Sequence, residues 1–88
     1  MEIKILGGGC PNCNRLEKVT RQALEEMGVE ATVTKVTDFG DIMAYDILST
    51  PGLVIHETVV SSGRVPRKDK VMSMITTAMS ATEDEPAG

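Results

Sequence analysis

The chain has 88 residues, 41% hydrophobic and 25% charged, so it is long enough for one small globular domain and too apolar to be disordered. No run approaches the roughly 18 apolar residues that a membrane-spanning helix needs, which excludes a membrane protein. The net charge of −4 and the aromatic content of 2% argue against binding to DNA or RNA, because phosphate backbones attract cations and single-stranded bases stack on aromatic rings.

The first third of the chain is predicted to form a β-α-β unit. Alternating apolar residues indicate a strand over residues 2–6, and the glycines at 7–9 end it. A helix is expected over residues 11–27, with apolar residues at spacings of three and four, and Gly28 is its stop. Residues 29–36 alternate and are rich in β-branched side chains, which predicts a second strand.

A second helix is expected after Asp38, whose side chain can cap it. Its predicted apolar face consists of Phe39, Ile42, Met43 and Ile47. The Pro-Gly pair within residues 49–52 ends this helix.

The last part of the chain is predicted to form a hairpin and a third helix. The hairpin strands are residues 53–55 and 58–60, joined by His56-Glu57, with a turn at 61–63. The helix runs from Lys68 to Met79. Its predicted inward residues are Val71, Met74, Ile75, Ala78 and Met79.

These elements give the order β-α-β-α-β-β-α in a single domain over residues 1–80. The opening β-α-β unit requires a parallel strand pair and the hairpin adds antiparallel strands, so we expect a mixed sheet covered by helices. Residues 81–88 are acidic and are expected to be a disordered tail.

The chemistry is predicted at the two cysteines, Cys10 and Cys13, which lie between the first strand and the first helix. Unpaired N–H groups and the helix dipole favour a thiolate in the first helical turn. The second cysteine lies one turn further on the same side, so the pair can close a disulfide. The start of the chain is too short and polar to be a signal peptide, so we expect a cytosolic protein. Cytosolic thiols are kept reduced and a disulfide that closes so short a loop would stabilise little, which argues against a structural disulfide. This leaves redox chemistry or metal binding.

The metal alternative would use the same two thiolates. A zinc site usually needs four ligands, and one chain offers only the two cysteines and His56. Two chains could share a four-cysteine site, or a soft ion such as Cu(I) could bind the pair alone. Heavy-metal carriers place a Cys-x-x-Cys in a similar loop, but here Gly8 stands where they have Met, and the order of elements differs.

Three segments carry a family resemblance: Gly7-Gly8-Gly9-Cys10-Pro11-Asn12-Cys13, Ser49-Thr50-Pro51-Gly52-Leu53-Val54-Ile55 and Val59-Val60-Ser61-Ser62-Gly63-Arg64-Val65-Pro66. Together they resemble the small thioredoxin-like proteins called redox-active disulfide protein 2. The resemblance implies an α/β fold of minimal thioredoxin type, with sheet order 2-1-3-4, three flanking helices and strand three antiparallel to strand one. It also implies dithiol–disulfide exchange, with Cys10 as nucleophile and Cys13 as the resolving cysteine.

The resemblance further implies that Pro51 is cis and lies beside the cysteine pair, and that Thr50 and Pro51 shape the substrate site. Gly8 and Gly9 are expected to let the loop pass close to bound substrate. Pro11 and Asn12, between the cysteines, are included in this site and should tune the redox potential. We expect a monomer without cofactor, with protein or small-molecule disulfides as substrates and, by resemblance, a flavin-dependent disulfide reductase as partner.

Two other polar residues are candidates for a role near the thiols. His56 should lie about 16 Å from Pro51 along an extended strand, too far to act as a base for Cys10, so it is predicted to be a surface turn residue. Lys4 occupies the position where thioredoxins often have a buried aspartate. Either it lies near Cys13 and assists thiolate formation, or its stem packs on the sheet while its amine reaches water.

Overall fold

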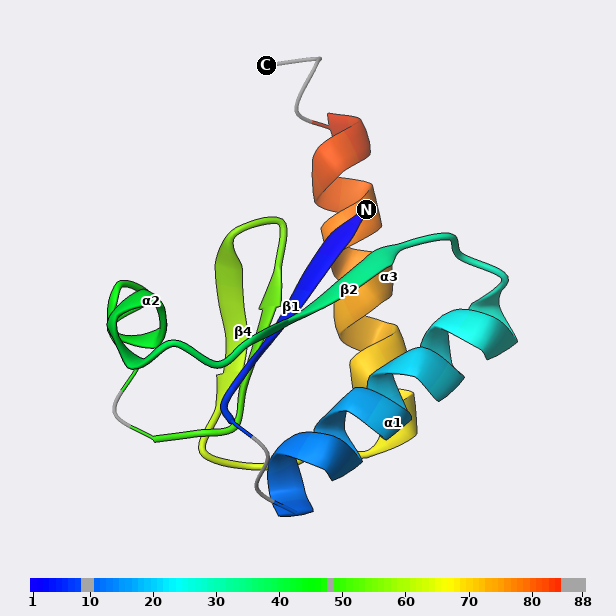
Figure 1. The fold of residues 1–88 in the computed structure, drawn as a ribbon. Coiled ribbons are helices and arrows are strands. Elements are labelled where there is room, and N and C mark those ends of the chain that lie inside the picture. The colour runs from blue at the N-terminus through cyan, green and yellow to red at the C-terminus, as the bar shows by residue number, and fades with distance from the viewer. Residues whose placement is uncertain (9–10, 48, 85–88) are drawn as a thin grey trace.

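A four-stranded mixed sheet forms the centre of the molecule in this computed structural model, which describes residues 1–8, 11–47 and 49–84 (Figure 1). Its strands are β1 (Glu2–Leu6), β2 (Thr32–Val36), β3 (Gly52–Ile55) and β4 (Thr58–Ser62), in the spatial order β2-β1-β3-β4. β1 pairs with β2 in parallel, and β3 is antiparallel to both of its neighbours. The predicted fold class and sheet order are therefore confirmed.

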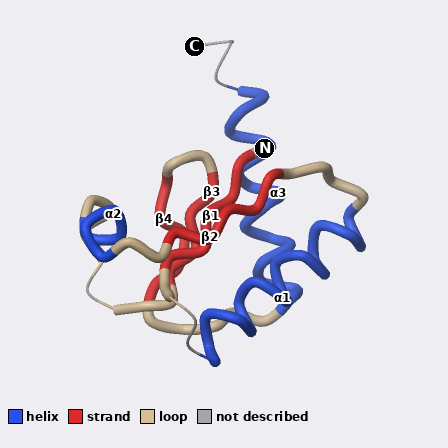
Figure 2. Tube along the Cα trace, in the orientation of Figure 1, coloured by secondary structure: helices blue, strands red, loops and turns tan. Residues whose placement is uncertain are grey.

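Helices cover both faces of this sheet (Figures 1 and 2). α1 (Pro11–Met27) and α3 (Lys68–Asp84) lie on one face, and the short α2 (Phe39–Met43) lies on the other. The end of β1, the start of α1 and the start of β3 gather at one end of the sheet (Figure 1), where Leu6 pairs with Gly52 and Gly7 lies against Cys13.

Alternation along β1 divides the core between the two faces. Ile3 and Ile5 point towards α1 and α3 and belong to the larger apolar cluster. The other members of that cluster are Leu16, Ala23, Leu24, Leu53, Ile55, Val71 and Ile75. Leu6, on the opposite face, joins Ile42, Ile47 and Val54 in a smaller cluster under α2. The α2 side therefore has the thinner core, and this is the side on which a surface groove forms.

Three strand boundaries differ from the predicted ones because strand pairing sets them, and the smallest difference is that β3 begins at Gly52, which pairs with Leu6, instead of at residue 53. β2 begins at Thr32, opposite Glu2 at the start of β1, so residues 29–31 have no strand to pair with. Ser61 and Ser62, predicted as turn, pair with β3 and belong to β4. The predicted hairpin is confirmed, with His56 and Glu57 at its turn, both at positive φ.

α3 differs from its prediction in length and in one inward residue. It continues past the expected end at Met79 to Asp84, into the segment expected to be a tail, whose disorder stays a prediction. Val71 and Ile75 are fully buried, as predicted, but Met79 is 37% exposed. In Figure 1 the last turns of α3 extend beyond the sheet, so there is no sheet surface for Met79 to cover.

The difference in burial between Ile75 and Met79 gives a stability prediction within α3. Replacing Ile75 by alanine should lower the free energy of unfolding by about 3 kcal/mol, because it leaves a cavity in the larger cluster. Met79→Ala, the matched control, should lower it by less than about 1 kcal/mol. Urea denaturation of both variants measures the difference, and equal losses would contradict the assigned burial.

Candidate functional site

Cys13 lies in the first turn of α1 and is fully buried. The structure has it disulfide-bonded. Its expected partner Cys10 and the neighbouring Gly9 fall outside the described residues. The thiolate predicted at the helix start is that of Cys10, so its placement stays a prediction, whereas Cys13 lies on α1 as expected.

Gly7, the residue that follows β1, lies directly against this sulfur. Its φ is +140°, a conformation that L side chains rarely adopt. A Cβ added to Gly7 would lie 2.5 Å from Cys13 Sγ and 3.4 Å from Cβ of Thr50. Gly7 therefore brings the end of β1, the start of α1 and the segment before β3 into one site. The sequence indicated that Gly7 ends a strand and belongs to a glycine loop that passes close to substrate, but it did not indicate this contact with Cys13.

The Thr50–Pro51 peptide bond is cis, as the family resemblance implied. Pro51 is buried and Thr50 is exposed. The carbonyl of Pro51 accepts a hydrogen bond from the N–H of Gly63, at 2.8 Å. This bond ties the end of β4 to the Thr50–Pro51 segment, while the N–H of Gly7 donates to the carbonyl of Val36 at 2.9 Å. Backbone hydrogen bonds thus fix both Gly7 and Pro51.

A groove of about 380 Å³ opens beside this segment on the α2 side. Gly7, Gly8 and Thr50 line one part of it, and Phe39 and Met43 line another. Its remaining lining residues are Thr37, Ile42, Ile47 and Ser49. The site thus has an apolar wall next to the residues that surround Cys13.

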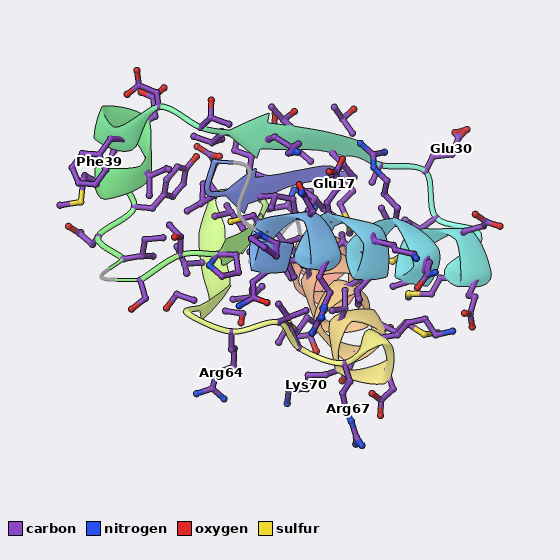
Figure 3. The ribbon with its side chains drawn as sticks, turned by 60° about the horizontal axis from the view of Figure 1, so that its bottom comes forward. Glu17, Glu30, Phe39, Arg64, Arg67 and Lys70 are labelled. Carbon is purple, nitrogen blue, oxygen red and sulfur yellow. The ribbon has the colours of Figure 1, made fainter. Side chains whose placement is uncertain are left out.

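The exposure of that wall corrects the predicted apolar face of the second helix. Ile42 and Ile47 are buried as expected, but Phe39 is 74% and Met43 48% exposed. Asp38 caps the helix as predicted, with its side chain accepting from the N–H of Asp41, yet the helix ends at Met43. A five-residue helix has room for one buried turn only, and that turn buries Ile42. Figure 3 shows Phe39 on the outer side of α2.

The other predicted site residues are found around this groove or at the start of α1. Gly8 is exposed and lines the groove. Pro11 and Asn12 are exposed in the first turn of α1. The structure brings Gly7, Cys13 and Thr50 together, whereas Gly9 and Cys10 lie outside what it describes.

Lys4 does not lie beside Cys13, so that hypothesis is wrong. Its amine donates to the hydroxyl of Tyr45 at 2.9 Å and to the carboxylate of Glu57 at 2.7 Å. Glu57 belongs to the β3–β4 turn, at the opposite end of β3 from Pro51. Alternation along β1 places Lys4 on the α2 face, whereas α1 covers the other face.

These contacts give Lys4 a structural role. The hydrogen bonds that Lys4 donates to Glu57 and Tyr45 raise the pKa of Lys4, and the bond that Glu57 accepts from Lys4 lowers the pKa of Glu57. The hydroxyl of Tyr45 also donates to Glu57, at 3.1 Å. The three residues connect the segment after α2 to the sheet and to the hairpin turn. His56, in the same turn, is exposed, as predicted.

Within residues 1–8, 11–47 and 49–84, no three His, Cys, Asp or Glu side chains are close enough together to hold a metal ion. None of the helices in the same ranges is long and apolar enough to cross a bilayer.

Comparison with known proteins agrees with this geometry. Residues 1–76 match the family model of the thioredoxin domain. A thioredoxin of Methanocaldococcus jannaschii is 35% identical over 69 residues, which cover 78% of this chain and 79% of that protein. A thioredoxin of Methanothermobacter thermautotrophicus is 33% identical over 75 residues, covering 85% of this chain and 97% of that protein. The chain therefore belongs to the thioredoxin family and is a thioredoxin-like disulfide oxidoreductase.

Proposed function

We propose that the protein exchanges a dithiol for a disulfide through Cys10 and Cys13, on protein or small-molecule substrates. The observation that carries the proposal is the environment of Cys13. This cysteine is buried and disulfide-bonded in the first turn of α1, against Gly7 and next to Thr50, which precedes the cis proline. A helix start favours the thiolate form, which is the nucleophile in disulfide exchange.

The exchange proceeds in two displacements. The thiolate of Cys10 attacks one sulfur of the substrate disulfide, forming a mixed disulfide and releasing the other substrate sulfur as a thiolate. The thiolate of Cys13 then attacks the sulfur of Cys10 and releases the second substrate thiolate. Two electrons pass to the substrate, both of its sulfurs take up protons, and the protein is left with a Cys10–Cys13 disulfide. No cofactor is needed for these steps, because the electrons come from the dithiol.

We assign the substrate site to Thr50, Pro51, Gly8, Gly9, Pro11 and Asn12. By the family resemblance, the backbone of Thr50 pairs with an extended segment of the substrate. The groove lined by Phe39 and Met43 extends this site, because it begins at Gly7, Gly8 and Thr50 and offers an apolar surface. A side chain flanking the substrate disulfide would be partly buried there.

We further propose that the protein acts in cell redox homeostasis and electron transport in the cytoplasm. Within the thioredoxin family the chain resembles the redox-active disulfide protein 2 group. By that resemblance a flavin-dependent disulfide reductase returns the protein to its dithiol form. We expect it to act as a monomer through a domain of residues 1–80, with the acidic residues 81–88 as a solubilising tail.

Equilibration with glutathione buffers tests the proposal. Acid quenching and alkylation of the free thiols should show a single two-electron transition, with two alkylated cysteines in the reduced protein and none in the oxidised one. Metal analysis of the purified reduced protein is the second measurement. A stoichiometric metal that is lost in the Cys10→Ser variant, together with no defined transition, would contradict the redox function and point to a metal carrier.

The groove gives a separate prediction about substrate binding. Phe39→Ala should raise KM for a disulfide peptide with flanking leucines by about fivefold, since roughly 1 kcal/mol of apolar contact is lost. Its kcat and its rate with the small 2-hydroxyethyl disulfide should stay unchanged. Met79→Ala, another exposed apolar residue, is the control. An unchanged KM for the leucine peptide would exclude the groove from the substrate site.

A further inference from the structure

A second groove, of about 880 Å³, lies between β4 and the first half of α3. Arg64, Arg67 and Lys70 line it, and all three side chains are exposed. Figure 3 shows the three projecting on the same side of the molecule, where the β4–α3 connection leads into α3. Ser61 and Ser73 add hydroxyl groups to its lining. We call this groove the basic groove.

The cations of this groove stand out in an acidic chain. Residues 64–70 carry four cations and one anion, a net charge of +3, so the other 81 residues carry −7. Of the five cations outside this segment, three pair with a carboxylate: Lys4 with Glu57, and both Arg21 and Lys35 with Glu17. A concentration of one charge sign on an oppositely charged molecule marks a surface where electrostatics select a partner.

The three lining cations are not used by the fold. Among the described residues, Arg64, Arg67 and Lys70 form no ion pair and no side-chain hydrogen bond, whereas the neighbouring Lys68 is paired with Glu26. The one acidic residue of the groove, Asp69, accepts a hydrogen bond from the backbone N–H of Lys70 at 3.0 Å. Three cationic heads therefore remain available to an external anion.

The basic groove is joined to the proposed substrate site. Ser62, which lines the groove, is paired with Gly52, the residue after Pro51. The next residue, Gly63, donates its N–H to the carbonyl of Pro51 at 2.8 Å. A Cβ on Gly63 would lie 3.1 Å from Cβ of Ser49. A polypeptide whose disulfide is placed beside Pro51 can thus continue along β4 into the groove.

We propose that the basic groove binds an acidic segment of the protein whose disulfide is exchanged at the cysteine pair. This inference rests on the proposed exchange function and adds the class of substrate: disulfides with Asp or Glu residues near them in the chain. Binding of the acidic segment raises the encounter rate and orients the disulfide, while the chemistry at the sulfurs is unaltered.

Two synthetic peptides test the proposal, each with one intramolecular disulfide and differing only in a run of four glutamates or four glutamines beside it. The reduced protein should react about tenfold faster with the glutamate peptide at low ionic strength, as expected for three exposed charge pairs. The advantage should fall towards unity in 1 M salt, where charges are screened within about 3 Å.

A pair of triple variants locates the effect. Arg64→Gln/Arg67→Gln/Lys70→Gln should remove the preference for the glutamate peptide and keep the rate with the glutamine peptide. Lys18→Gln/Arg21→Gln/Lys35→Gln changes the net charge equally on another surface and should keep most of the preference. A wild-type protein without preference, or equal losses in both variants, would overturn the proposal.

A binding measurement separates this proposal from the exchange function. The glutamate peptide with its cysteines replaced by serine should shift the amide resonances of residues 61–73 in a titration followed by NMR, and the glutamine peptide should not. Absence of these shifts overturns the groove assignment whatever the activity. Shifts without any reaction of either disulfide peptide or of 2-hydroxyethyl disulfide would instead contradict the exchange function and leave the binding site supported.

Discussion

Replacing Cys13 by serine is expected to abolish catalytic turnover and to leave the protein joined to its substrate through Cys10. Without the resolving thiol the mixed disulfide has no internal nucleophile to release it. Mass spectrometry after incubation of the reduced variant with a disulfide peptide should show one adduct, mapped to Cys10. The loss of turnover should be complete, because the variant lacks the second of the two displacements.

The structure supports this division of roles through the burial of Cys13. Its side chain has no exposed surface, and Gly7 lies against its sulfur. A substrate disulfide on a polypeptide cannot approach a sulfur covered in this way, so we expect the substrate to react first at Cys10. We therefore expect Cys13 to act only after the mixed disulfide has formed.

Two further variants make the assignment of roles falsifiable. The Cys10→Ser variant should form no adduct, and an adduct on Cys13 in that variant would reverse the two roles. Because Cys13→Ser places a hydroxyl in a buried position, Cys13→Ala should be tested in parallel, with circular dichroism to check folding. Absence of an adduct in a folded Cys13→Ala protein would contradict Cys10 as the nucleophile.

The parts of the fold that could be predicted are those set by local patterns. Alternation defined β1, helical spacing from Pro11 to Met27 defined α1, and Gly28, which has a positive φ, ended it. The sheet order and the cis bond before Pro51 came from the family resemblance rather than from periodicity.

The features that could not be predicted depend on contacts between distant segments. Phe39 and Met43 fit an apolar helical face, but they are exposed because only one turn of α2 reaches the sheet. The spacing of Lys4 from the cysteines suggested a role in thiolate formation. Lys4 instead points to the α2 side of the sheet, where its amine binds Tyr45 and Glu57. The contact of Gly7 with Cys13 joins two elements whose relative placement no local pattern contains.

The contact between Gly7 and Cys13 predicts a large loss of stability when Gly7 is replaced. Gly7→Ala should lower the free energy of unfolding of the oxidised protein by about 2–4 kcal/mol, since a side chain is added at a φ of +140° and 2.5 Å from the sulfur of Cys13. The sulfur is held in a disulfide and cannot turn away freely. Either the helix start or the end of β1 must move.

The same displacement should slow disulfide exchange. A shift of about 1 Å in a reacting group can reduce a rate by about 10²-fold, so we expect a loss of this order with 2-hydroxyethyl disulfide under conditions where the variant is folded. Gly8→Ala is the matched control, because a Cβ there would meet only Thr37, at 3.8 Å. It should change stability by less than about 0.5 kcal/mol. If Gly7→Ala were as stable as Gly8→Ala and exchanged disulfides as fast as the wild-type protein, Gly7 would have no part in positioning the sulfur of Cys13.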